Sequence, residues 1–348
     1  MTAQVREPSP LLTRFVVASR YMPVFVALIV LWVFALIWVP SILDPLAIRA
    51  QAPYAAILAV LALGQMLVIM TGGIDLSVPG TIALTGMVLV TVNGPSDALF
   101  AQSLLAAIAV GAIIGLINGL LIGGLRLNAL IVTLAVGQLA AGVAFRSDRP
   151  GATPTAPGWA LWTRGTVFGL NRVFFTGLLL TAALILVFRY TTIGRKFQVA
   201  GANPQAAQVV GVRVRMNRIS AYMVAGVFSA IGGAMLAGLH GSASPRAGAG
   251  YLLAPIAAVV IGGAALTGGL ASPLATFAAA IFLTWLDQTM LTMGLPTSMQ
   301  MVVFGLVIVA GMMVSGDRII KGVERVLRER RRPKRTDGKR EKATSGTG

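Results

Sequence analysis

The sequence contains no cysteine and only one histidine, His240. Without cysteine there is no disulfide, thiolate metal site or haem attachment, and a single histidine does not make a metal site. The metalloprotease pair H-E-x-x-H and the phosphate-binding loop G-x-x-x-x-G-K-[ST] are also missing. These absences argue against redox, metal and nucleotide-hydrolysing chemistry in this chain, so we expect no catalytic residue, no cofactor and no metal.

Charged residues are scarce as well, at 11% of the chain, whereas hydrophobic residues make up 56%. With a mean hydropathy of +0.83, the 348 residues form an integral membrane protein rather than a soluble globule. The apolar runs are continuous, which indicates helices, because barrel strands would alternate polar and apolar residues. A spanning helix needs roughly 20 residues. The runs near this length are 21–43, 50–74, 76–92, 98–125, 127–145, 173–188, 219–245, 247–286 and 288–316.

The run 247–286 is long enough for two spans, with a break near Gly268 and Gly269. The fold class predicted is therefore all-α, a polytopic membrane helix bundle of about ten transmembrane helices. The runs define a membrane domain at 23–316, flanked by tails at 1–22 and 317–348.

Basic residues predict the orientation of this bundle. They precede the first span, fill the loop 191–218 and crowd the C-tail. An even number of spans places all three segments on one side, and the positive-inside rule makes that side cytoplasmic. Both termini are then cytoplasmic. Four arginines oppose this topology because they fall on the outer side: Arg146, Arg149, Arg164 and Arg172.

The net charge of +17 raises the question of nucleic acid. In the C-tail, Ile319, Val323 and Val326 recur at helical spacing among basic residues, which is typical of a helix on an anionic lipid surface. Each Lys or Arg near such a surface contributes about 1 kcal/mol. The alternative is a solvated tail without a specific role. No aromatic residues interleave the charges as single-strand binding requires, so membrane lipid is the expected partner and nucleic acid is not.

The segment 72–78, Gly-Gly-Ile-Asp-Leu-Ser-Val, places the carboxylate of Asp75 between two apolar runs. A charged Asp at the centre of a membrane helix costs roughly 2.5–3.5 kcal/mol, so its presence needs a reason. Asp75 either caps the helix that follows, with Gly72 and Gly73 allowing a tight turn, or belongs to a transport path.

Other polar side chains lie within otherwise apolar runs. Each either contacts a polar solute in a cavity or makes a hydrogen bond between helices. Small residues such as Gly111, Gly115 and Gly119 are expected to let helices approach closely, and His240 is expected at the membrane interface. The candidate solute-path residues are Gln65, Asp75, Ser77, Asn118, Asn128, Thr133, Gln138, Asp287 and Gln288.

The loop 191–218 contains signals for a short helix at 204–210. Asn203 suits the cap, Pro204 the first helical position and Gly211 the left-handed stop. Two turns are not stable alone in water, so the apolar side of this helix packs on something. That surface belongs either to its own membrane bundle or to a cytosolic partner.

Four segments together carry a resemblance. They are 63–66 with 72–78, 132–134, 194–207, and 256–269. In this order they are similar to the permease subunits of bacterial ribose, xylose and galactose-type ABC importers, over roughly residues 52–315. Each motif alone is weak, but the four in sequence are specific to the family.

The resemblance implies a multi-pass protein of the bacterial inner membrane that dimerises with a second permease subunit, as a homodimer or heterodimer. It implies that a periplasmic sugar-binding protein delivers a monosaccharide or related polyol, and that a cytosolic ATP-binding subunit supplies the energy. The missing phosphate-binding loop agrees with an external ATPase. The ATPase-coupling residues implied are Gly201, Asn203, Pro204, Gln205, Ala206, Ala207 and Gly211.

Two departures from the family pattern stand out. Pro79 occupies a position that is commonly Gly, and Leu252 and Ala254 replace acidic residues. If those acids contact the binding protein or the sugar in relatives, the partner or the sugar differs here. The rival class is an ion-coupled secondary transporter of a small polar solute. It is disfavoured because only Asp75 and Asp287 are ionisable within the spans, with no basic partner there.

Overall fold

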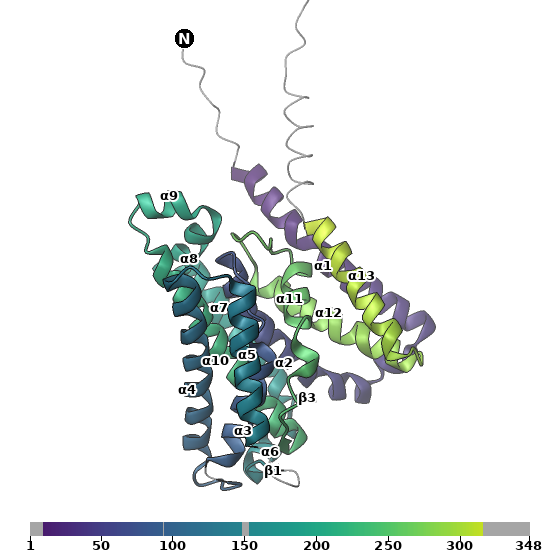
Figure 1. Ribbon diagram of the computed structural model, residues 1–348. Coiled ribbons are helices and arrows are strands. Elements are labelled where there is room, and N and C mark those ends of the chain that lie inside the picture. The colour runs from purple at the N-terminus through teal and green to yellow at the C-terminus, as the bar shows by residue number, and fades with distance from the viewer. Residues whose placement is uncertain (1–9, 93, 148–152, 316–348) are drawn as a thin grey trace, which may run out of the picture. The chain divides into compact units, whose positions relative to one another are not determined.

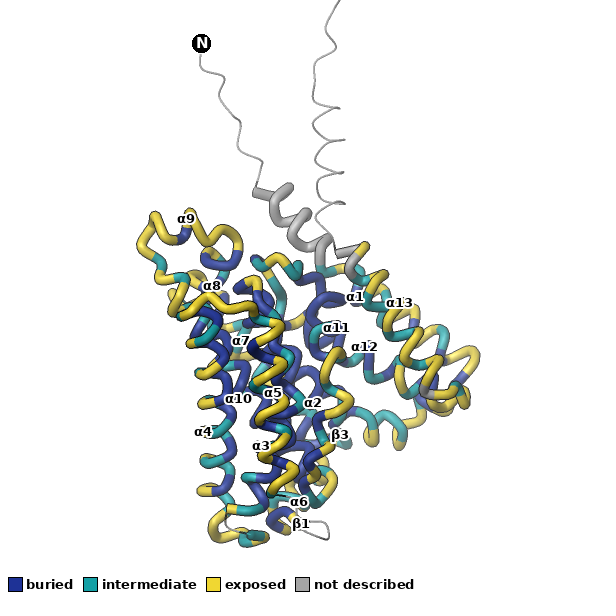
Figure 2. The backbone as a smooth tube through the Cα atoms, viewed as in Figure 1, coloured by how far each residue is buried: buried dark blue, intermediate teal, exposed yellow. Residues whose placement is uncertain are grey.

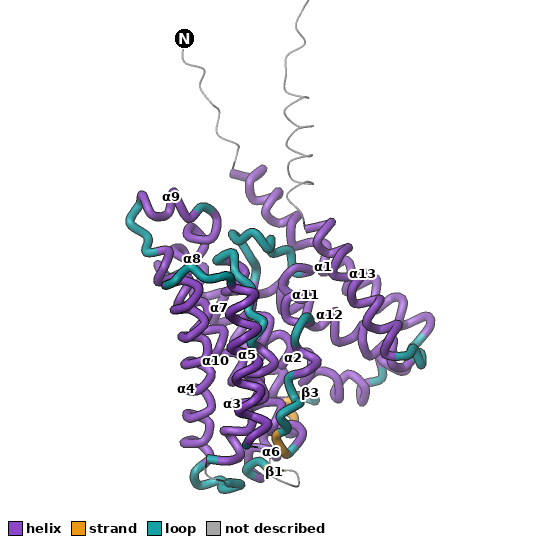
Figure 3. The backbone as a smooth tube through the Cα atoms, viewed as in Figure 1, coloured by secondary structure: helices purple, strands orange, loops and turns teal. Residues whose placement is uncertain are grey.

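The computed structural model describes residues 10–92, 94–147 and 153–315, which form a helical membrane unit (Figure 1). Helices dominate it, and strands are confined to short pairs (Figure 3). The α-helices are α1 (Pro10–Trp38), α2 (Pro45–Met70), α3 (Val78–Thr91), α4 (Phe100–Gly119), α5 (Ala129–Arg146), α6 (Pro157–Arg164), α7 (Arg172–Tyr190), α8 (Thr192–Ala202), α9 (Pro204–Val209), α10 (Val214–His240), α11 (Ala254–Ile261), α12 (Pro273–Thr292) and α13 (Thr297–Ser315).

Shorter elements join these helices. The 3-10 helices are η1 (Pro40–Leu43) and η3 (Ala249–Tyr251), and the π-helix η2 (Leu120–Gly124) extends α4. Strand β1 (Thr153–Pro154) pairs antiparallel with β4 (Ser242–Ala243), and β2 (Thr166–Val167) pairs with β3 (Leu170–Asn171). The β1–β4 pair ties the segment before α6 to the end of α10.

Among the described residues, seven helices are long and apolar enough to cross a membrane, and this confirms an all-α polytopic protein. Three further apolar helices are shorter, at Val78–Thr91, Ala249–Ile261 and Ser298–Gly311. The expected break near Gly268 and Gly269 is also confirmed, because both glycines have positive φ, +96° and +113°, in the turn between α11 and α12. An L side chain rarely adopts that conformation.

The predicted boundary between the runs 247–286 and 288–316 is wrong. Helix α12 continues through Asp287 to Thr292, and α13 begins at Thr297. Asp287 is exposed on the helix surface, where one carboxylate does not interrupt the backbone hydrogen bonds. The chain turns instead at Gly294, whose φ is +72°, just before Pro296.

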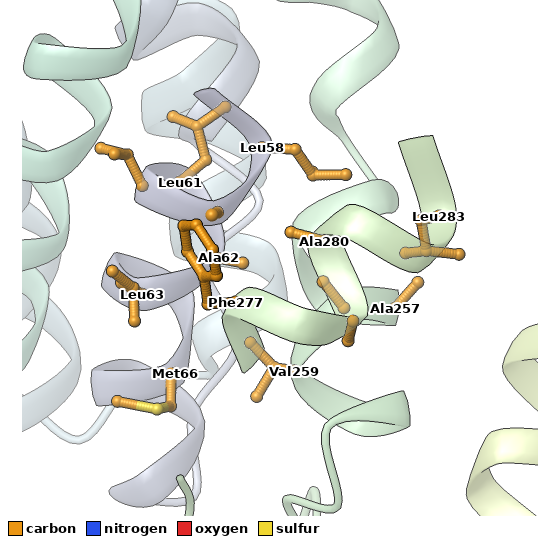
Figure 4. Packing of buried hydrophobic residues seen from close by; sticks show 14 of the residues in the cluster. Leu58, Leu61, Ala62, Leu63, Met66, Ala257, Val259, Phe277, Ala280 and Leu283 are labelled. Atoms are coloured by element: carbon orange, nitrogen blue, oxygen red, sulfur yellow. The ribbon is translucent and has the colours of Figure 1, made fainter. Parts of the chain in front are cut away.

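Helix α2 is the centre of the core. It packs against α10, α12, α7 and α11, and every residue from position 55 to position 70 is buried. Its sequence is apolar all round, as expected for an interior helix. Leu58, Leu61 and Met66 lie beside α11 and α12, from which Val259, Phe277 and Leu283 are drawn (Figure 4).

The outer helices carry the opposite pattern. On α1 the side chains of Ile29 and Leu36 are each 64% exposed, and yellow positions follow the outer sides of α1 and α13 (Figure 2). Water does not solvate such surfaces well, whereas lipid tails do. The exposed apolar side chains therefore agree with a membrane environment.

Close packing of α4 on α10 depends on glycine, as expected. A methyl group at Gly115 would overlap the carbonyl oxygen of Tyr222 and lie 2.8 Å from Cα of Met223. At Gly111 it would lie 2.7 Å from Cβ of Ala230, and at Gly119 2.7 Å from the carbonyl oxygen of Ile219. The predicted packing role of these three glycines is therefore confirmed.

Candidate functional site

The loop 71–77 between α2 and α3 contains the only carboxylate of that region, and it is buried. Gly72 turns the chain with φ +75°, which confirms the expected tight turn. A methyl group at Gly73 would overlap the hydroxyl of Tyr222, which donates a 3.4 Å hydrogen bond to the carbonyl oxygen of Ile74. Helix α10 thus holds this loop closely from one side.

Asp75 is 2% exposed and its carboxylate is used locally. Its Oδ1 accepts hydrogen bonds from the backbone N of Ser77 at 2.8 Å and from Ser77 Oγ at 2.6 Å. The carboxylate therefore accepts from the amide of Ser77, the residue before α3. It accepts from no amide within α3 itself. Bonds to a charged acceptor are the stronger ones, and they offset part of the cost of burying Asp75.

The hydrogen bonds continue from Ser77 to α4. Asn118 Nδ2 donates to Ser77 Oγ at 2.9 Å, which leaves the Ser77 hydroxyl proton for Asp75. Asn118 is fully buried, and its Oδ1 has no hydrogen-bond partner among the described residues. Asn118, Ser77 and Asp75 therefore form one directed chain of donors that ends on the carboxylate.

Two further candidates hold the same loop. With its amide turned to suit both partners, Gln65 donates to the carbonyl oxygen of Asp75 at 3.1 Å and accepts from its backbone N at 3.1 Å. Thr133 Oγ1 on α5 accepts from the backbone N of Leu76 at 3.0 Å and donates to the carbonyl oxygen of Ala129 at 2.7 Å. The structure thus brings together five predicted residues from α2, α4, α5 and the loop, namely Gln65, Asp75, Ser77, Asn118 and Thr133, which we name the loop cluster.

The other four candidates lie elsewhere. Asn128 is exposed and caps α5, its Oδ1 accepting from the backbone N of Leu130 at 2.9 Å. Gln138 is exposed on α5, and Asp287 is exposed on α12. Gln288 is half-buried and accepts a 2.6 Å hydrogen bond from Gln51 at the start of α2.

Sequence reasoning missed two residues that hold the loop. Arg218 Nη2 donates to the carbonyl oxygen of Thr71 at 3.4 Å, and Tyr222, one turn later on α10, reaches Ile74. Arg218 was interpreted only as a charge of the loop 191–218. The signal available was the spacing of Arg218 and Tyr222, since residues four apart lie on one helix face.

One small pocket lies near the end of α10. It lies between α3 and α10 and occupies about 200 Å³, including the space at its open mouth. Ile82, Gly233, His240 and Ser244 are among its lining residues, and none of the nine candidate residues is. His240 is exposed at the end of α10, with Nε2 3.5 Å from the Tyr54 hydroxyl.

The expected short helix is present as α9. Asn203 Oδ1 accepts from the backbone N of Gln205 at 3.1 Å and of Ala206 at 3.0 Å, and Gly211 has φ +79°. Only Ala207 of this helix is buried. Ala207 packs on the protein's own helices, whereas Val209 is 87% exposed and Val210 71% exposed, so these two apolar side chains are not covered by the bundle.

A second helix of the same loop, α8, was not predicted. Thr191 caps it by accepting from the backbone N of Gly194 at 3.2 Å. Its buried residues include Phe197, Ala200 and Gly201. The spacing of Phe197 and Gly201 at i and i+4 was the signal in the sequence that could have identified this helix.

Comparison with known proteins gives one family and several relatives. The family described as "Branched-chain amino acid transport system / permease component" matches residues 48–312. The chain is 33% identical over 267 residues to the ribose import permease protein of Escherichia coli (strain K12), covering 75% of this chain and 82% of the relative. It is 30% identical over 305 residues to the galactose/methyl galactoside import permease protein of the same organism, covering 82% and 91%.

A third relative is the autoinducer 2 import system permease protein of Yersinia pseudotuberculosis serotype O:1b (strain IP 31758). It is 32% identical over 281 residues, covering 80% of this chain and 79% of the relative. No solved structure matches this chain.

Proposed function

This chain belongs to the family of permease components that matches residues 48–312, and from that premise we propose that it is the transmembrane permease subunit of an ATP-driven importer. It resides in the inner membrane, and its ATP hydrolysis is the work of a separate subunit. The match over most of the membrane domain is the observation that carries this proposal. It extends the expected resemblance from short motifs to a continuous match over residues 48–312.

The cargo we propose is a monosaccharide or a related polyol, delivered by a periplasmic binding protein. The family description refers to branched-chain amino acids, whereas the relatives are import permeases for ribose, galactose/methyl galactoside and autoinducer 2. The relatives' names favour a sugar-like solute. Leu252 and Ala254 stand in place of the acids expected there, and if those acids contact the binding protein or the sugar in relatives, the partner or the sugar differs here.

The candidate polar residues divide into two groups in this proposal. The loop cluster fixes the 71–77 loop against α2, α4 and α5, since its bonds are made within the protein. The exposed Asn128, which caps α5, and the exposed Gln138 on α5 are then the better candidates for solute contact. A second permease subunit packed against α5 would enclose these side chains.

The ATPase-coupling element of the proposal is α9. Its support is the exposure of Val209 and Val210 on a capped two-turn helix, because such a helix needs a partner to cover its apolar side. The coupling residues are those of the motif around it: Gly201, Asn203, Pro204, Gln205, Ala206, Ala207 and Gly211.

The topology we propose has ten transmembrane helices, the seven long spans and the three shorter apolar helices. In Figure 1 the first turns of α1, the end of α13 and α9 lie toward one end of the view, and α6 and β1 toward the other. This arrangement supports placing both termini and α9 on the cytoplasmic side. The domain at 23–316 is then the permease domain, and the tail 317–348, including its apolar stripe for lipid, lies outside the described residues.

Neither the surroundings of the two aspartates nor the named relatives favour the ion-coupled secondary transporter. Asp75 is bonded to Ser77 within the loop cluster, and Asp287 is exposed on α12. The three relatives named above are import permeases.

The test is transport by the assembled complex. The reading frames next to this one would be searched for a secreted binding protein and an ATP-binding subunit. Both would be purified, and calorimetry would identify the sugar that the binding protein takes. Uptake of that sugar into proteoliposomes is expected only with the binding protein outside and ATP available to the ATPase. Accumulation driven by a proton or sodium gradient without the ATP-binding subunit would contradict the proposal.

A further inference from the structure

Three segments that are far apart in the sequence meet at one point beside the 71–77 loop. They are the end of α2 at Met70, the last turn of α8 at Gly201, and the turn before α12 at Gly268 and Gly269. The backbone N of Gly269 donates a 3.1 Å hydrogen bond to the carbonyl oxygen of Met70. We name this meeting point the glycine junction.

The glycine junction is a contact between backbones. A methyl group at Gly201 would overlap the carbonyl oxygen of Met70 and lie 3.1 Å from the backbone N of Gly269. A methyl group at Gly268 would lie 3.1 Å from the backbone N of Gly72 and 3.2 Å from the carbonyl oxygen of Gly201. No flexible side chain separates the three segments, so a movement of one is transmitted directly to the others.

One side of the junction leads to α9. Gly201 precedes by two residues Asn203, whose side chain caps α9. A partner that moves α9 therefore pulls on the last turn of α8. A second tie runs to α10, because Asn217 Nδ2 donates to the carbonyl oxygen of Lys196 on α8 at 3.3 Å.

The other side of the junction leads to the loop cluster. Met70 is followed directly by the 71–77 loop, in which Thr71 accepts from Arg218 and Asp75 accepts from Ser77. Asn118 and Thr133 then connect this loop to α4 and α5. A continuous chain of contacts thus connects α9 to the loop cluster.

We propose that the glycine junction transmits the movement of α9 to the 71–77 loop, with Gly201 as the positioning residue of this connection. The inference rests on the proposed docking of the ATP-binding subunit at α9. It adds which part of the bundle responds to that docking, namely the loop cluster around Asp75. The transport cycle then changes the position of this loop whenever nucleotide changes the position of α9.

The experiment is hydrogen–deuterium exchange in nanodiscs on the permease without its ATP-binding subunit and on the full complex, with the complex compared between its ATP-bound and ADP-bound states. In the natural sequence, binding of the ATP-binding subunit is expected to protect residues 199–211, and the nucleotide state is expected to change exchange in 71–77. In Gly201→Ala the protection of 199–211 should remain and the nucleotide response of 71–77 should disappear. Solute imported per ATP hydrolysed should fall about tenfold, a usual size for coupling between linked sites.

Gly305→Ala is the matched control, because a methyl group there has nothing within 4 Å. It should leave exchange and transport unchanged. Wild-type import stoichiometry in Gly201→Ala would overturn the proposal. If Gly201→Ala fails to assemble, the complex with the natural sequence provides the test. The proposal is also overturned if nucleotide changes the exchange of 199–211 but not that of 71–77. Absence of protection at 199–211 would instead refute docking at α9, so the two failures are distinguishable.

Discussion

Replacing Ser77 by Ala tests the loop cluster most directly, because Ser77 is its central member. Its hydroxyl donates to Asp75 Oδ1 at 2.6 Å and accepts from Asn118 Nδ2 at 2.9 Å. Ser77→Ala removes both bonds and little volume. The backbone N of Ser77 still donates to Asp75, so the turn itself is kept.

The magnitude follows from the groups left behind. A hydrogen bond to a charged group contributes about 1.5–3 kcal/mol, and a buried donor left without a partner costs about 1–3 kcal/mol. The bond from Asn118 to Ser77 joins two helices, and such bonds average only about 0.6 kcal/mol, which sets a floor near that value. The stranded amide of Asn118 decides the outcome, because its Oδ1 already has no described partner. We expect Ser77→Ala to lower the free energy of unfolding by about 2–4 kcal/mol.

Asn118→Leu separates the bond from the stranded amide. It removes the same interhelical bond but leaves no unpaired amide, so its cost should be smaller, about 1 kcal/mol. For the same reason, Asn118→Leu should lower the free energy of unfolding less in the Ser77→Ala variant than in the natural sequence. The double-mutant cycle is then expected to show a coupling energy of about 1–2 kcal/mol.

The assay is reversible unfolding of the purified protein in mixed micelles, followed by circular dichroism. Thr276→Val is the control. The Thr276 hydroxyl is buried without a described partner, so its removal leaves no other group without a hydrogen bond. Additive single effects, or a Ser77→Ala cost within about 0.5 kcal/mol of zero, would refute the connected chain from Asn118 to Asp75.

Three further predictions concern packing and docking. Gly115→Ala should destabilise by about 1–3 kcal/mol because the methyl group overlaps α10, whereas Gly142→Ala, with nothing within 4 Å, should be neutral or stabilising in the same unfolding assay. Asn203→Ala removes a cap worth about 1 kcal/mol and should weaken binding of the ATP-binding subunit, measured by surface plasmon resonance on nanodiscs; unchanged affinity would contradict it. Val209→Asp, at a side chain that is 87% exposed, should lower that affinity about tenfold without changing the unfolding free energy, and full affinity would argue against docking at α9.

Local signals predicted much of the fold because each acts within a few residues. The apolar runs identified most of the membrane helices, and Asn203, Pro204 and Gly211 identified α9 to within a residue. The boundary at Asp287 was misplaced because an exposed carboxylate on a helix surface does not end the helix. Helix α8 was missed because its buried residues recur over only a few turns and its exposed side mixes polar residues with Ile193 and Val199.

The candidate site was predicted only in part. Polar residues in apolar runs were recognisable, but their surroundings were not. Asn118 is hydrogen-bonded to Ser77, and Thr133 to the backbone of Leu76. Gln138, on the same helix as Thr133, is exposed. Periodicity places Thr133 and Gln138 on different sides of α5, but it does not say which side meets α3. That choice depends on how the neighbouring helices pack.

The sequence by itself determined that this protein is a helical membrane protein, because transfer of apolar side chains from water and short capping patterns are local properties. Its four motifs, taken in order, carried the resemblance to a permease family. Only the tertiary structure decided that Arg218 reaches Thr71 and Tyr222 reaches Ile74, which are 147 and 148 positions apart. It also decided that Gly72, Gly201 and Gly268 meet. Contacts of this kind arise when glycine-lined backbones approach to van der Waals distance, and that approach is set by the packing of the whole bundle.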